Sequence, residues 1–382
     1  MTSLLIIIVL ALLAVAVWQL TKIFDLTQVG KKESSSDDSQ VANDKDNNIQ
    51  GYIMFAFLAF IYIFTIYGLL KWGPLTLGTS ASEHGSVIDN LFNISLLLIF
   101  FVQTITQFLL YYFSFKYRGR KDQKALYFAD NNKLELIWSV IPAVVLAGLI
   151  LYGLFAWTEI MFVDEKTEDV MVIELYGQQF NWKARLSGED NVLGKANVRY
   201  IQGINSTGTD PSDKYAQDDI VVTELHIPKG KKILFKMRSQ DVLHSAYMPH
   251  FRAQMNCVPG MVTQFAFTPI YTTSEMREDD LIVRKVSNIN NIRIKKSNDL
   301  IAEGKTGLDP YEFDYLLLCN KVCGASHYNM QMKIIVDTPS DFKKWAKAQD
   351  KFGKSIKDEQ MAKDSTAVTK SLTIVDDKLA VK

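Results

Sequence analysis

Several residue types and motifs are scarce in this chain, and their scarcity narrows its possible functions. The 382 residues include three cysteines and five histidines, and no Cys-x-x-Cys-His motif occurs, which excludes a fused c-type haem domain. The 42 basic and 42 acidic residues cancel, so nothing indicates nucleic acid or another polyanion as a partner. The apolar N-terminal part lacks the clustered histidines that would hold a haem inside a membrane.

One stretch nevertheless concentrates metal donors. Two cysteines, a histidine and a methionine fall within twelve residues, at Cys319, Cys323, His327 and Met330. Thiolate, thioether and imidazole together favour copper over hard cations, and methionine is a poor zinc ligand. Strand-like runs flank the stretch, so we expect the donors on a turn between two strands. A Cys319–Cys323 disulfide and a single helix face are the alternative interpretations.

A fifth donor, His244, lies upstream in the motif Asp241-Val242-Leu243-His244. With this motif, the Cys-x3-Cys-x3-His-x2-Met stretch resembles subunit II of cytochrome c oxidase. The resemblance implies a dinuclear copper A centre with one backbone carbonyl among its ligands. The implied ligands are His244, Cys319, Lys321 (through its carbonyl), Cys323, His327 and Met330.

The same resemblance implies an electron-entry role. Electrons would pass from a c-type cytochrome to copper A and then to haem and copper B in partner subunit I, where oxygen is reduced with proton translocation. Subunit III is the other expected oxidase partner. The enzyme activity would then be the cytochrome c oxidase activity of the whole complex.

Four apolar runs predict membrane helices, because each approaches or exceeds the roughly 20 residues that cross a bilayer. They are Leu4–Leu20, Tyr52–Leu70, Leu91–Phe113 and Leu136–Trp157. The first run has no basic segment before it and no convincing cleavage site after it, so we expect a retained helix. The basic loop Lys116–Lys133 is expected to be cytoplasmic. The C-terminal domain then lies on the periplasmic side of a bacterial inner membrane.

The region after Asp169 changes to short strands separated by Pro/Gly turns, which predicts a β-sandwich or small barrel. The resemblance makes this an all-β, cupredoxin-like Greek-key domain after a membrane α-helical region of about four transmembrane helices. We divide the chain into residues 1–89 (two extra helices and a polar linker), 90–163 (a helix hairpin), 164–345 (the copper domain with insertions) and 346–382 (a charged tail).

Two positions depart from the family pattern. Phe180 stands where the family has the tryptophan through which electrons enter, so Phe180 and Trp182 are both candidates for electron entry. Lys321 replaces the glutamate that supplies a ligand to a second, magnesium or manganese, ion. The acidic residue before Val-Pro-Gly is also changed, to Asn256, so the resemblance does not carry over that second metal site.

Other features carry weaker predictions. Glu135 is either a solvated carboxylate or, as the resemblance implies, a residue near the mouth of a proton pathway. Asp241 is interpreted as a solvated acid and Cys257 as a free thiol. The polar stretches Gly188–Asp218 and Thr272–Asp309 are expected to be surface insertions.

Three other classes of protein were weighed. A copper-free quinol oxidase subunit is disfavoured by the complete ligand set. Nitrous oxide reductase needs a second, histidine-rich copper cluster, which five histidines cannot supply in addition. A membrane-anchored copper chaperone would need neither Glu135 nor all five side-chain ligands.

Overall fold

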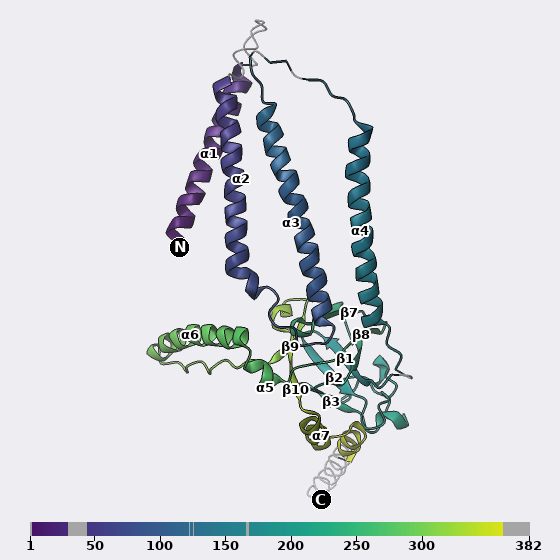
Figure 1. Ribbon diagram of the computed structural model, residues 1–382. Helices are drawn as coiled ribbons and strands as arrows, with labels where there is room; N and C mark the ends of the chain where they lie inside the picture. Colours follow the sequence, from purple (N-terminus) through teal and green to yellow (C-terminus); the bar gives the residue numbers. More distant parts are fainter. Residues whose placement is uncertain (1, 30–43, 122, 125, 166–167, 362–382) are drawn as a thin grey trace, which may run out of the picture. The chain divides into compact units, whose positions relative to one another are not determined.

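The computed structural model describes residues 2–29, 44–121, 123–124, 126–165 and 168–361 (Figure 1). The predicted flexible connector falls largely on residues 30–43, and the end of the predicted charged tail is residues 362–382; both lie outside the described residues. The chain forms two compact units, which are described separately. We call Met1–Gly73 with Leu96–Ile141 the helical unit, and Pro74–Ser95 with Pro142–Lys382 the β-unit.

Four long helices contain the predicted apolar runs. They are α1 (Thr2–Val29), α2 (Asp44–Trp72), α3 (Gly85–Lys116) and α4 (Asn132–Met161). The helices α2, α3 and α4 are long and apolar enough to span a membrane, whereas the apolar part described for α1, Val9–Ile23, is shorter. Each helix extends past its apolar run. The backbone hydrogen bonding of a helix does not require apolar side chains, so it continues into the flanking residues.

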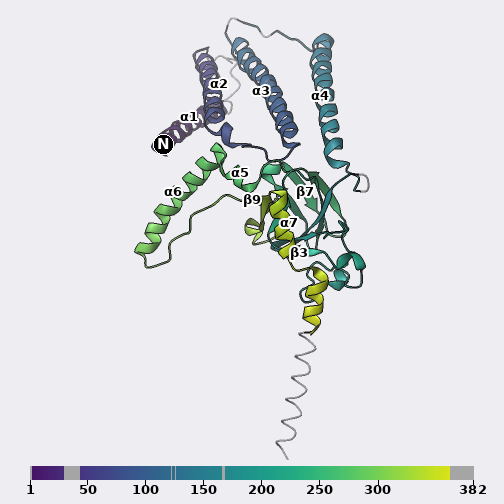
Figure 2. The same ribbon diagram turned by 60° about the horizontal axis from the view of Figure 1, so that its bottom comes forward.

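The β-unit is built around a sandwich of two five-stranded sheets (Figure 2). The first sheet has the order β3-β2-β1-β5-β8 and the second β4-β10-β9-β6-β7. The strands are β1 (Met171–Gln178), β2 (Asn181–Leu186), β3 (Ile220–Val222), β4 (Leu225–Pro228), β5 (Ile233–Ser239), β6 (His244–Met248), β7 (Ala253–Cys257), β8 (Thr263–Phe267), β9 (Tyr315–Cys319) and β10 (Gln331–Asp337). The predicted membrane-helical region followed by an all-β domain is confirmed.

The core of the sandwich lies between the two sheets. Alternate residues of β1 and β5, including Ile173, Leu175, Phe235 and Met237, are fully buried there against the second sheet. The intervening residues of β1, including Val172, Glu174 and Tyr176, are buried as well, on the outer face of the first sheet. A slip of β1 by one residue would place the charged Glu174 between the sheets, so burial fixes the register of this strand.

Strand directions bring four loops to one end of the sandwich. The strands β1 and β5 pair in parallel, so the β1–β2 and β5–β6 loops lie together. In the second sheet His244 at the start of β6 pairs with Cys257 at the end of β7, and Ala246 pairs with Cys319 at the end of β9. The β7–β8 and β9–β10 loops therefore join the same end.

The first insertion is bound to the outer face of the first sheet by buried charges. Arg185 of β2 forms ion pairs of 2.8 Å with Glu174 of β1 and with Asp219, and it also donates to the carbonyl of Gly194 at 2.8 Å. Arg238 of β5 contacts Glu174 at 2.5 Å. The insertion is thus part of the folded domain, although its sequence predicted only a surface segment.

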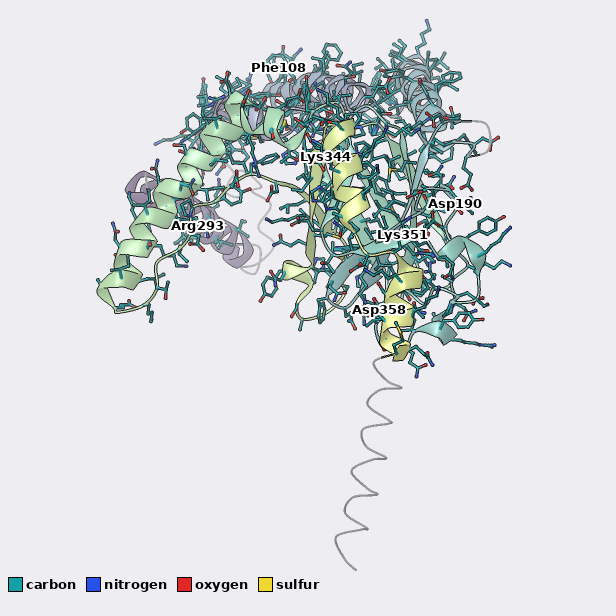
Figure 3. The ribbon with its side chains drawn as sticks, turned by 90° about the horizontal axis from the view of Figure 1, so that it is seen from below. Phe108, Asp190, Arg293, Lys344, Lys351 and Asp358 are labelled. Atoms are coloured by element: carbon teal, nitrogen blue, oxygen red, sulfur yellow. The ribbon has the colours of Figure 1, made fainter. Side chains whose placement is uncertain are left out.

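The second insertion forms helices, which the sequence did not predict. Helix α5 (Thr273–Arg277) is followed by α6 (Asp280–Ala302), and α6 extends away from the sandwich (Figure 3). The returning chain is fastened to α6 by side-chain hydrogen bonds, such as that from Arg293 to the carbonyl of Asp309 at 2.8 Å. After β10, helix α7 (Pro339–Ala348) contacts β4 and β10.

Candidate metal centre

The β9–β10 loop gathers the donors predicted from the sequence. The sulfur atoms of Cys319 and Cys323 lie 3.8 Å apart, and both thiols are free. The Cys323 sulfur is 3.6 Å from Nδ1 of His327 and 3.8 Å from the Met330 sulfur. A short 3-10 turn, His327–Asn329, turns the chain back so that these side chains face one another.

The remaining two predicted ligands complete the cluster. His244, fully buried at the start of β6, places Nδ1 3.8 Å from the Cys319 sulfur. The backbone carbonyl of Lys321 lies 3.2 Å from the same sulfur, while the Lys321 side chain is exposed. The donor atoms of His244, Cys319 and Cys323 all lie within 4.8 Å of one another. Five side chains and one carbonyl thus converge on one small volume.

Two residues of neighbouring loops hold this cluster in place, and the sequence analysis missed their roles. Asp241 accepts a hydrogen bond from Nε2 of His244 at 2.8 Å, which leaves Nδ1 facing the sulfur atoms. The backbone N–H of Gln179 donates to the other Asp241 oxygen at 2.7 Å, and the Gln179 side chain donates to the carbonyl of Cys323 at 2.5 Å. Asp241 is therefore not a freely solvated acid. The Gln179 contacts join separate loops and have no sequence motif, whereas the spacing of Asp241 and His244 within one motif could have indicated theirs.

The electrostatics of Asp241 agree with this bonding. Partial burial opposes ionisation, but the hydrogen bonds from Gln179, His244 and Val242 together hold the pKa of the carboxyl below its usual value. The charged carboxylate thus fixes the orientation of the imidazole through a charge-assisted hydrogen bond.

The two candidates for electron entry lie at different depths. Trp182 is 2% exposed, and its ring centroid is 5.9 Å from that of His244 in an edge-on arrangement. Phe180 is only partly buried and packs against the core. A Cβ atom at Gly324 would lie 2.9 Å from the Phe180 ring, so this glycine allows the ligand loop to approach the aromatic residue. Trp182 is thus next to a ligand, and Phe180 is nearer the surface.

The donor set fits copper. Thiolate sulfur, thioether sulfur and imidazole nitrogen are ligands of copper, and no carboxylate is among the converging atoms. Burial, reinforced by the neighbouring Cys319, raises the pKa of the Cys323 thiol to about 11. Without a metal this thiol stays protonated at neutral pH, and binding of an ion releases its proton.

Glu135 does not belong to this cluster. It lies in the first turn of α4, within the helical unit, and its side chain is exposed. Its backbone N–H donates to the carbonyl of Asn131 at 2.9 Å, as expected at a helix start. The structure leaves its role in proton uptake as a prediction.

The fold and the site together define a class: a membrane-anchored β-sandwich that presents a soft-ligand metal centre at one end. Residues 70–155 match the family described as cytochrome c oxidase subunit II, transmembrane domain, and residues 171–274 match its periplasmic domain. The chain belongs to the cytochrome c oxidase subunit II family. It is accordingly a membrane-anchored protein with a periplasmic domain.

Relatives agree with this assignment. The chain is 32% identical to the alternative cytochrome c oxidase subunit 2 of Bradyrhizobium diazoefficiens, over 76% of this chain and 88% of that protein. It is 23% identical to the cytochrome c oxidase subunit 2 of Thermostichus vulcanus, over 69% of this chain and 76% of the relative. Among solved structures, the periplasmic domain of subunit II from Bradyrhizobium japonicum is 17% identical over 47% of this chain and 93% of its own, with a TM-score of 0.27.

Proposed function

We propose that this chain is the electron-entry subunit of a respiratory cytochrome c oxidase in a bacterial inner membrane. It would accept electrons from a c-type cytochrome at a dinuclear copper A centre and pass them to haem in subunit I, where oxygen is reduced and protons are translocated. The observation that carries this proposal is the convergence of His244, Cys319, Cys323, His327 and Met330, with the carbonyl of Lys321, within contacts of 3.2–3.8 Å.

The residues of the chain have separate tasks in this proposal. The thiols of Cys319 and Cys323, after loss of their protons, would hold the copper together with the other donors, and the bound copper would supply a one-electron relay. Asp241 orients the imidazole of His244, and Gln179 fixes the Cys323 carbonyl. Burial of His244, Cys319 and Cys323 keeps bulk water from competing for the ligand positions.

The surface around the centre suits a protein partner. The four loops at this end, residues 179–180, 240–243, 258–262 and 320–330, contain one carboxylate and one ammonium group, those of Asp241 and Lys321. Exposed apolar side chains surround the donors, with Val322 84% and Tyr328 88% exposed. Such a concentration of apolar groups on a soluble surface is typical of a docking site. We assign it to the electron donor and to the neighbouring oxidase subunits.

The alternative is a copper-free structural subunit of the quinol oxidase kind. A copper-free subunit would have no use for the complete donor set. It would also have no need for the Asp241 contact that orients His244. The donor set therefore favours the copper-containing function.

Copper analysis of the full chain in detergent tests the proposal. We expect two coppers per chain and an electron paramagnetic resonance signal with one electron shared equally between them. Cys323→Ser should abolish the shared signal, because a hydroxyl is a poor copper ligand. Ser212→Ala, on the first insertion and remote from the cluster, is the matched control and should keep both coppers. A wild-type chain that binds no copper after reduction of its thiols would refute the electron-entry role.

A further inference from the structure

The second pronounced polar feature of the chain lies at the end of α3, within the helical unit. The start of α3 is fixed to the periplasmic domain, since Arg252 forms an ion pair with Asp89 at 2.6 Å within the β-unit. The helix ends at Lys116, and the loop that follows carries most of the basic residues between the third and fourth apolar helices. By the positive-inside rule we place this last turn and the loop on the cytoplasmic side of the membrane.

This loop encloses a basic pocket of about 1210 Å³ within the helical unit. Four cationic side chains line it: Lys116, Arg118, Arg120 and Lys124. No acidic residue is found among its described lining residues, and none of the four cations forms an ion pair with a carboxylate in the described ranges. The sequence Lys116–Lys133 holds six basic and two acidic residues, so the excess of positive charge belongs to the whole loop.

The pocket also has an apolar wall. Leu126, Phe128 and Leu134 line it together with aromatic residues of the last turns of α3. Leu126 and Phe128 are 79% and 64% exposed, which is costly in water but favourable beside lipid chains. A ligand that matches both walls has an anionic head and an apolar tail.

Contacts with the extra helix α2 hold the loop that lines this pocket. The basic residues of the pocket therefore have defined positions. Asn48 accepts a hydrogen bond from Nε of Arg118 at 2.6 Å, and Asn47 donates to the carbonyl of Gly119 at 2.9 Å. Asp44 accepts from the backbone N–H of Lys121 at 3.0 Å. Three polar residues in the first turns of α2 thus hold three consecutive parts of the loop.

Close packing reinforces these hydrogen bonds. Gly51 of α2 is buried, and a Cβ atom there would lie 2.4 Å from the Phe115 ring. That ring also contacts Tyr52 at 5.3 Å between centroids, and the guanidinium of Arg118 lies 3.9 Å above it. The arrangement orients Arg118 before any ligand binds, which lowers the entropic cost of binding.

We propose that this pocket binds one anionic phospholipid of the cytoplasmic leaflet, and that α2 serves to hold the pocket in shape. The phosphate-bearing head would contact Lys116, Arg118, Arg120 and Lys124, and the acyl chains would lie along the apolar wall. Basic pockets between membrane helices on this side are suited to such headgroups, and the anionic leaflet supplies them. This inference is independent of copper binding.

Lipid titration of the delipidated full chain in detergent, followed by native mass spectrometry, tests the proposal. We expect one phosphatidylglycerol per chain at concentrations where phosphatidylcholine does not bind. Arg118→Gln with Arg120→Gln should weaken binding about 25-fold, taking about fivefold for each cation near the surface. Lys71→Gln, in the last turn of α2, is the matched control and should bind like the wild type.

The variant Asn48→Ala distinguishes a specific lipid site from nonspecific attraction between the basic loop and anionic lipids. It removes the contact that positions Arg118 and leaves every charge in place. We expect it to weaken phosphatidylglycerol binding several-fold, with unchanged helix content by circular dichroism. Equal binding of the two lipids, or wild-type binding by Asn48→Ala, would overturn the proposal. Displacement of the lipid by millimolar inorganic phosphate would assign the pocket to a soluble phosphate compound and would overturn it too.

Discussion

The β-sandwich buries polar side chains in two places that are built in opposite ways. Around Arg185 each charge faces an opposite charge, with ion pairs of 2.8 Å to Glu174 and Asp219. Around Cys319 the side-chain donors lie 3.6–3.8 Å from one another, and thiols are weak hydrogen-bond donors. The charges of the first cluster are paired within the chain, although Oδ1 of Asp219 has no hydrogen-bond partner. The second cluster, in the proposed function, is completed by an added ion. Stability is therefore expected to depend on the first, and function on the second.

The largest effect on stability should come from Arg185→Leu. The change leaves Asp219 buried without a cation and leaves Glu174 with Arg238 alone. Removing one partner of a buried ion pair costs about 3–5 kcal/mol. Amide hydrogen exchange of β1, β2 and β5 in the full chain would measure this loss. Lys229→Gln is the control, because it removes an ion pair with Glu275 whose partners are about a third and a half exposed, and exposed pairs contribute about 1 kcal/mol or less. Equal amide exchange rates in Arg185→Leu and Lys229→Gln would contradict the claim that the buried Arg185 cluster stabilises the fold.

A smaller effect should come from Asp241→Asn, which weakens the charged hydrogen bond that orients His244. Loss of such an outer partner lowers metal affinity about 10–100-fold. Copper release to a competing chelator would measure it, with unfolding of the sandwich unchanged. Lys321→Ala is the matched control, since only the backbone carbonyl of that residue faces Cys319. Release from Lys321→Ala as fast as from Asp241→Asn would contradict the role assigned to the carboxylate.

A further effect should come from Asp219→Asn, and it should depend on pH. Burial raises the pKa of Asp219 to about 7, although the Arg185 guanidinium opposes the shift. Because the folded-state pKa exceeds the usual 3.8, this group stabilises the fold fully below pH 3.8, and that contribution is lost as the pH rises toward 7. Asparagine keeps an acceptor for Arg185 and does not titrate. The wild type should lose stability between pH 4 and pH 7 relative to the variant, and parallel pH profiles would exclude this titration.

The sequence predicted the metal cluster better than its surroundings. The motif spacing identified four side-chain donors that the fold brings together, because they lie on one loop. His244 was the fifth candidate, and the resemblance implied the Lys321 carbonyl. The contacts of Gln179 with Asp241 and Cys323 could not be predicted, since they join loops whose proximity depends on how the strands pair. The Asp241–His244 contact lies within one motif, but the motif does not show that the two side chains meet. The proposed roles of Phe180, Trp182 and Glu135 stay predictions.

The sequence predicted which parts of the chain form membrane helices and which form strands, but not their bounds or their contacts. Apolar runs identified the long helices, but α3 extends past its predicted run at both ends, to Gly85 and to Lys116, where apolar and polar residues are mixed. The insertion Thr272–Asp309 was expected as a surface segment, yet most of it is helical, with Asp279 capping α6. Arg185 was missed because a charged residue in a strand is usually solvated, and its partners come from another strand and from the insertion. The four-part division of the chain also stays a prediction.

His244 is separated from Cys319 by 75 residues, and this distance sets the order in which the centre is assembled. The donors between Cys319 and Met330 become neighbours once a single hairpin has formed. The imidazole of His244 joins them only when β6 pairs with β9. The chain between these two strands contains β7, β8, α5 and α6. Contacts so remote in sequence form late, because closing the long loop costs entropy. In the proposed function, tight copper retention would therefore mark a chain whose periplasmic half has finished folding.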